Sequence, residues 1–66
     1  MKIEVEQEAD GRWIAEAPAL PGVMAYDTTR DEAVRKVETL ALRVMADRLE
    51  NGENIPEAQS VFSVTQ

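Results

Sequence analysis

Four glutamates near the start of the chain are the first candidates for chemistry. Glu4, Glu6 and Glu8 recur at every second position, and Glu16 follows in the next segment. Carboxylates that converge on two metal ions about 4 Å apart can hydrolyse phosphodiesters. The chain has no histidine and no cysteine, which excludes Cys/His zinc sites, thiol nucleophiles and serine–histidine–aspartate triads. A row of alternating glutamates is more typical of a solvated strand face, so we expect no enzymatic activity and no catalytic, cofactor or metal site.

The charges are distributed unevenly along the 66 residues, whose net charge is −6. Residues 1–29 hold two basic and six acidic side chains, residues 30–50 hold five of each, and residues 51–66 hold two acidic ones. Such an acidic surface repels phosphate backbones, so we expect no direct binding to nucleic acid. It suits a basic protein partner instead. The alternative is that the acidity only keeps the protein soluble.

The length predicts a single domain over residues 1–66 that is marginal as a monomer. A chain of this size buries only about 60% of the surface that its unfolded form exposes. We therefore expect a homodimer or a higher homo-oligomer. No stretch approaches the roughly 20 apolar residues of a membrane helix, so no membrane association is expected. The lack of cysteine fits a cytoplasmic location.

Two strands joined by a tight turn are predicted over residues 2–9 and 12–17. The first alternates strictly between apolar or neutral and charged residues, and Asp10-Gly11 is a turn signal. A two-residue loop would place Trp13 on the same face as the glutamates. A three-residue loop over residues 9–11, with Gly11 left-handed, places Val5 opposite Ala15 on an apolar face. Because a one-residue slip exchanges the faces, the apolar pattern favours the three-residue loop.

That register also decides which side chains share the acidic face. It sets Glu8 opposite Arg12 and Glu4 opposite Glu16, buries Trp13, and leaves Ile14 among the acids. We predict that acidic side chains steer a basic partner and that Ile14 anchors it. The predicted partner-binding residues are Glu4, Glu6, Glu8, Ile14 and Glu16.

A helix is predicted over residues 29–51, after a Pro- and Gly-containing link at 18–22 and a third strand at 23–27. Thr29 and Glu32 have the spacing of a capping box, and Asn51-Gly52 is a C-terminal signal. Its apolar stripe is wider than one sheet requires, because Leu42, Met45 and Leu49 extend it. We predict that these three contact another subunit, the alternative being an exposed apolar flank.

A last strand at residues 60–66 completes an α+β fold of βββαβ order. Phe62 and Val64 share one face of this strand. If the strand lies beside the first one and parallel to it, the four-stranded mixed sheet has the order 3-2-1-4. The single helix then covers one sheet face and leaves the acidic face open.

Two motifs resemble the HicB-like antitoxin family. Residues 10–22 read DGRWIAEAPALPG and residues 29–33 read TRDEA, which is similar to the family's DGG-aromatic-hydrophobic-A-E-x-P-x-L-P-G segment followed by T-x-x-E-A. The resemblance covers roughly residues 1–50. It departs from the family at Val23, where many members have cysteine, and at residues 26–28, where a glycine turn is usual.

The resemblance implies a partial ribonuclease H-like fold and a function as an antitoxin. Members of the HicB-like family commonly neutralise HicA, a small basic ribonuclease. The resemblance therefore implies a HicA-like partner here. Family members continue into a DNA-binding domain where this sequence ends, at Gln66, so operator binding is not expected from these residues. The alternative is an orphan HicB-like oligomeric scaffold that has no toxin partner.

Overall fold

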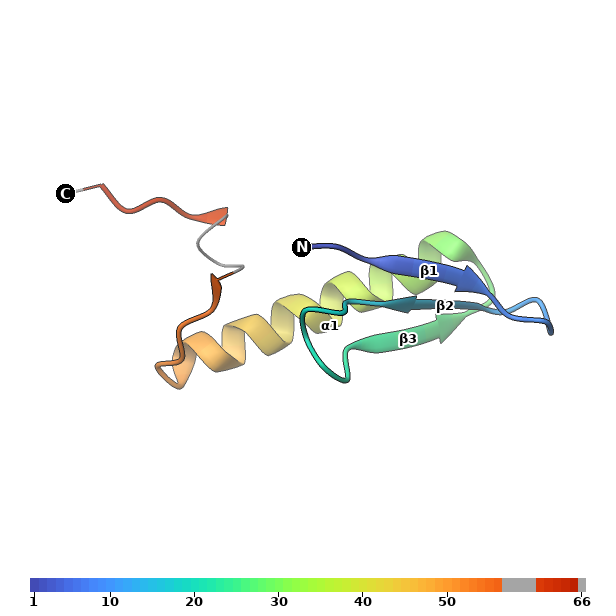
Figure 1. Ribbon diagram of the computed structural model, residues 1–66, viewed down its shortest axis with the longest axis horizontal. Helices are drawn as coiled ribbons and strands as arrows, with labels where there is room; N and C mark the ends of the chain where they lie inside the picture. Colours follow the sequence, from blue (N-terminus) through green and yellow to red (C-terminus); the bar gives the residue numbers. More distant parts are fainter. Residues whose placement is uncertain (57–60, 66) are drawn as a thin grey trace.

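The chain forms a three-stranded antiparallel sheet with one long helix across one of its faces (Figure 1). The computed structural model describes residues 1–56 and 61–65. The strands are β1 (Glu4–Gln7), β2 (Trp13–Glu16) and β3 (Met24–Asp27), in the order β1-β2-β3, and the helix is α1 (Arg30–Glu50). The α+β class and the first four elements therefore agree with the prediction from the sequence.

The hairpin of β1 and β2 has the register that the apolar pattern favours. Val5 is paired with Ala15, and the backbone amide of Glu8 donates to the carbonyl oxygen of Arg12 at 2.7 Å. Residues 9–11 form the loop, with a φ of +91° at Gly11. Because only glycine adopts this left-handed conformation without strain, Gly11 fixes the three-residue loop and with it the faces of both strands.

The link between β2 and β3 places one of its side chains in the core. The Ala17 amide donates to the Val23 carbonyl oxygen at 3.0 Å, and the Leu20 amide donates to the Ala17 carbonyl oxygen at 2.9 Å. These hydrogen bonds hold the link in a compact turn, in which Gly22 has a φ of +86°. Leu20 is only 1% exposed, so this loop supplies one of the largest buried side chains.

Helix α1 begins and ends at the signals that the sequence carries. The Thr29 Oγ1 accepts a hydrogen bond from the Glu32 amide at 3.2 Å, as a capping residue does. Asn51 caps the other end, and Gly52 follows at a φ of +80°. Between these caps the face toward the sheet buries Ala33, Val37, Ala41 and Met45.

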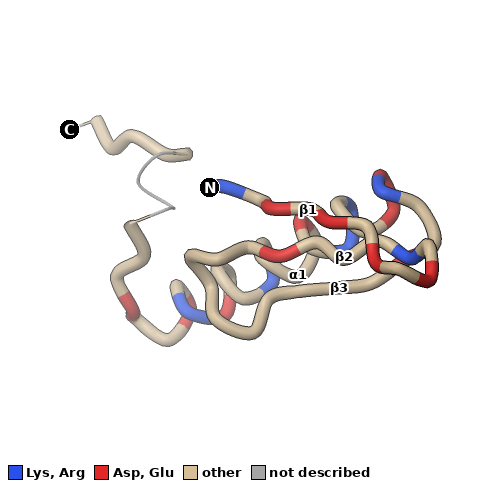
Figure 2. Tube along the Cα trace, turned by 45° about the vertical axis from the view of Figure 1, so that its right-hand side comes forward, with Lys and Arg blue, Asp and Glu red and all other residues tan. Residues whose placement is uncertain are grey.

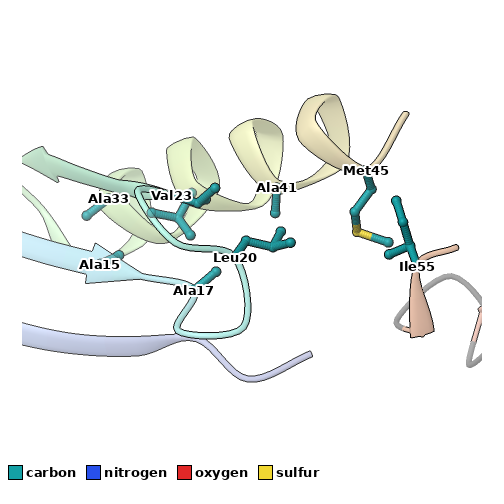
Figure 3. Packing of buried hydrophobic residues seen from close by; sticks show 9 residues of the cluster. Ala15, Ala17, Leu20, Val23, Ala33, Ala41, Met45 and Ile55 are labelled. Carbon is teal, nitrogen blue, oxygen red and sulfur yellow. The ribbon is translucent and has the colours of Figure 1, made fainter. Parts of the chain in front are cut away.

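The core between the sheet and α1 is small (Figure 3). Among the described residues, nine are buried in it, four of them alanines, and Leu20 and Val37 are the largest that are fully buried. Trp13 is half-buried and packs against this cluster at its edge, as Ile3 and Val5 do. Alanine methyl groups contribute little apolar area, so this core alone gives modest stability.

The sheet of the described residues has three strands and not the four that the sequence predicts. Residues 61–65 are described and do not pair with it, while residues 60 and 66 of the predicted last strand lie outside the described part. No described strand covers the outer edge of β1. The molecule is elongated, 51 × 20 × 15 Å, and its radius of gyration of 13.8 Å exceeds the roughly 11 Å of a compact domain of this length.

Candidate protein-binding face of the sheet

The sheet face opposite α1 brings together four of the five predicted partner-binding residues. Glu4 is paired with Glu16, and Glu6 with Ile14, so all four side chains share this face. They line a shallow hollow of about 380 Å³ together with Val5. Figure 2 shows the acidic positions following one another along β1 and β2. The three glutamates are exposed and Ile14 is half-buried, which fits charged groups around an apolar floor.

Glu8, the fifth predicted residue, lies where β1 meets the loop and is half-buried. Arg12 is opposite it along the backbone, but the Arg12 side chain turns to Asp10, with Nε 2.8 Å from Oδ2. The Arg12 amide also donates to Asp10 Oδ1 at 3.0 Å. These two hydrogen bonds hold the pKa of Asp10 below its ordinary value. Glu8 is therefore opposite Arg12 as predicted, but it does not line the hollow, and the Arg12 side chain is bound to another carboxylate.

Two residues of β3 complete this face, and the sequence does not predict them. Met24 is paired with Glu16 and Tyr26 with Ile14, so both point to the same side as the glutamates. Their exposed fractions are 41% and 43%. In the sequence, Met24 and Tyr26 alternate with Val23 and Ala25, which indicates that they share one face of a strand. Which face of the sheet this is depends on the register between β2 and β3, and the sequence does not fix that register.

The resulting surface, called the open face below, is acidic along β1 and apolar along β3. Its side chains are Glu4, Glu6, Ile14, Glu16, Met24 and Tyr26. At one end the guanidinium carbon of Arg12 lies 5.0 Å from the centroid of the Tyr26 ring, a cation–π contact. At the other end Lys2 Nζ lies 3.4 Å from Glu4 Oε1, a solvent-exposed ion pair of small energetic weight.

The predicted subunit contact on α1 divides into two exposed residues and one buried residue. Leu42 and Leu49 are 66% and 46% exposed. Met45 is 9% exposed and belongs to the core, where it points toward Ile55 from the segment after the helix (Figure 3). Met45, which was predicted to contact another subunit, is thus covered by Ile55 of its own chain, and the subunit contact itself stays a prediction.

A second hollow, of about 220 Å³, lies between the start of β1 and α1 and is called the β1–α1 hollow below. Its lining is largely apolar and consists of Met1, Ile3, Glu38, Ala41, Leu42, Met45 and Val61. It joins the exposed flank of the helix to the uncovered edge of the sheet.

Neither a metal centre nor a membrane span is found within residues 1–56 and 61–65. The carboxylates there form no group of three or more that could hold a metal ion. Within this part of the chain, helix α1 is not long and apolar enough to cross a membrane.

No protein-family model matches this chain, and no curated protein or solved structure matches it either. Its function is therefore inferred from the spacing of its motifs and from the geometry of the open face.

Proposed function

We propose that the protein is an antitoxin-like interaction module that neutralises a small basic ribonuclease of the HicA type. It docks the open face on the RNA-binding surface of the toxin and thereby occludes it. The observation that carries this proposal is the gathering of Glu4, Glu6 and Glu16 around Ile14 on one solvent-facing side. The resemblance of residues 10–22 and 29–33 to HicB-like antitoxins supplies the class of partner.

The open face has the composition that such a competitor of RNA requires. Its glutamates present the charge that a basic RNA-binding surface attracts, and they speed the encounter over distance. Ile14, Met24 and Tyr26 offer apolar area beside them, and partly exposed aromatic groups of this kind are frequent anchors of protein interfaces. Affinity then comes from the apolar strip, and selectivity for a basic partner comes from the acids.

The cytoplasmic location and the ribonuclease H-like sheet of order 3-2-1-4 are parts of the same proposal. The absence of cysteine from the chain supports the first. The uncovered outer edge of β1, in the described residues, supports the second, because a strand in this position gives that order.

Co-expression with a small basic HicA-type ribonuclease, followed by pull-down, tests the proposal. We expect a stable complex and loss of RNA cleavage. The triple variant Glu4→Gln, Glu6→Gln, Glu16→Gln is expected to weaken the complex, so that the pull-down retains less of the ribonuclease. A matched control, Asp47→Asn, Glu50→Gln, Glu53→Gln, changes the net charge equally at exposed positions near the end of α1 and is expected to keep it. Equal losses in both triple variants would overturn the assigned face.

The second candidate is an orphan oligomeric scaffold with the same fold and no toxin partner. The exposed Leu42 and Leu49 favour it, because apolar patches on small proteins commonly mark interfaces. This function predicts self-association without capture of the basic ribonuclease, so the pull-down distinguishes the two candidates.

A further inference from the structure

The last described segment, residues 61–65, has the apolar composition of a strand in a protein core, but its apolar side chains are exposed to solvent. Val61, Phe62 and Val64 are 68%, 66% and 88% exposed. Phe62 and Val64 alternate with Ser63 and Thr65, a period-two pattern with one apolar side. A segment of this kind gains stability when its apolar side is covered and its backbone joins a sheet edge.

The edge that fits this segment is the outer edge of β1. No described strand pairs with it, and α1 packs chiefly over β2 and β3, which leaves the inner side of β1 thinly covered. Ile3 and Val5 point to that side and are half-buried. The β1–α1 hollow lies beside them and exposes Leu42, so a neighbouring strand with an apolar side would close it.

The chain does not direct its own segment to this edge. Val61 lines the β1–α1 hollow beside Met1 and Ile3, at the start of β1. From there residues 62–65 run away from the sheet, opposite to the direction of β1 (Figure 1). This course accounts for part of the elongated shape, with a longest dimension of 51 Å. A two-fold axis near Val61 can generate a second copy whose β1 runs opposite to the β1 of the first copy. Residues 62–65 of the first copy then run beside the β1 of the second copy and parallel to it.

We propose that the protein is a homodimer in which residues 61–65 of each copy form a strand on the outer edge of β1 of the other copy. The sheet of each half then has the order 3-2-1-4, with strand four contributed by the second copy. Phe62 and Val64 cover Ile3, Val5 and the β1–α1 hollow, while Ser63 lies beside Glu4. This exchange of identical segments satisfies two-fold symmetry and leaves both open faces accessible, so it goes beyond the proposed function and does not depend on it.

Sedimentation of the full chain at micromolar concentration tests the dimer. We expect a dimer whose Kd rises about 100-fold or more in the double variant Phe62→Ser, Val64→Ser, because large apolar side chains then stay in water. The matched double variant Met24→Ser, Leu40→Ser alters two partly exposed side chains away from the β1–α1 hollow and is expected to remain dimeric. Circular dichroism confirms that each variant keeps its helix. A monomeric wild-type chain, or equal weakening by both variants, would overturn the proposal.

Cross-linking distinguishes the exchanged segment from one that folds back on its own chain. The chain has no cysteine, so the double variant Glu4→Cys, Ser63→Cys holds the two thiols of interest and no others. Mild oxidation is expected to give a covalent dimer on a non-reducing gel. A disulfide within one chain, seen as a faster-moving monomer, would show that the segment pairs in its own copy. Failure to form either disulfide would rule out this register.

Discussion

Glu4 and Glu16 lie directly opposite one another across β1 and β2. Like charges in this position repel at short range and destabilise an antiparallel pair, whereas most cross-strand pairs stabilise one. The open face therefore carries a repulsion that a basic side chain placed between the two carboxylates would relieve. In the proposed complex, a basic side chain of the partner would take this place.

Removing one of these charges is expected to stabilise the free protein and weaken the complex. Glu16→Gln should raise the free energy of unfolding by up to about 0.5 kcal/mol, because the cross-strand repulsion is lost. Thermal unfolding at low salt measures this gain, which should shrink at about 1 M salt, where the Debye length is roughly 3 Å. Glu50→Gln is the control, since it lies outside the sheet. A destabilised Glu16→Gln protein would contradict the assigned repulsion.

We expect steering by the open face to make the rate of association with the basic partner depend on salt. Stopped-flow mixing with the basic ribonuclease should give a rate constant that falls about tenfold or more between low salt and roughly 0.5 M salt. The triple glutamine variant of Glu4, Glu6 and Glu16 should have a flatter dependence. The rate of dissociation should change less than the rate of association. A salt-insensitive association rate would remove electrostatic steering from the mechanism.

Local patterns in the sequence predict the hairpin and the helix because each is fixed by neighbouring residues. Alternation in β1 together with the glycine at position 11 leaves one register that separates apolar from acidic side chains. Thr29 and Asn51 cap α1 from within a few residues of its ends. The position of Ile14 among the glutamates follows from the same register, so this part of the candidate site was accessible from the sequence alone.

Features that depend on distant contacts were not accessible in this way. Met24 and Tyr26 join the open face through pairing with β2, which the intervening link sets by folding Leu20 inward. Met45 is buried because Ile55 returns to the end of the helix. The predicted fourth strand has an apolar side at Phe62 and Val64, but composition does not specify which edge, or which copy, it joins.

Tyr26 is expected to act as an anchor for the partner with little effect on folding. Tyr26 is 43% exposed beside Ile14, and its ring lies under the Arg12 guanidinium. Tyr26→Ala should weaken the complex by about 2 kcal/mol, roughly 30-fold in Kd, because a buried aromatic anchor is lost. Calorimetric titration measures this change. Tyr26→Phe keeps the ring and should bind nearly as the wild type does, and equal losses in both variants would argue against a role of the ring.

Acid should loosen the attachment of β3 to α1. Lys36 Nζ lies 2.7 Å from Asp27 Oδ2, and the Thr28 amide donates to Asp27 Oδ1 at 2.6 Å. The lysine hydrogen bond, with that amide, lowers the pKa of Asp27, and the same pair raises the pKa of Lys36. A carboxyl group whose pKa is lowered in the folded state stabilises the fold at pH values above its unfolded pKa of about 3.9. This stability is lost as the pH falls through the folded pKa.

The variant Asp27→Asn is therefore expected to unfold at a lower temperature than the wild type at pH 7 and to differ less from it in acid. The raised pKa of Lys36 adds stability below its unfolded value of about 10.4, which is lost as the pH rises through the folded value, so the difference should also narrow in strong alkali. Melting curves over the pH range measure both effects. Glu53→Gln is the control, and parallel pH profiles for Asp27→Asn and the wild type would contradict this assignment.

Leu20 is expected to be the most sensitive single position of the core. It comes from the link between β2 and β3 and is 1% exposed. Among the described residues it is one of the two largest fully buried side chains, in a cluster rich in alanine. Leu20→Ala should cost about 2–5 kcal/mol, which for a domain of this size approaches the whole free energy of unfolding. Urea unfolding at matched protein concentration measures the loss. Leu20→Met keeps the volume and should cost less than about 1.5 kcal/mol. If Leu20→Ala cost no more than Leu20→Met, the link would not be holding β2 and β3 against α1.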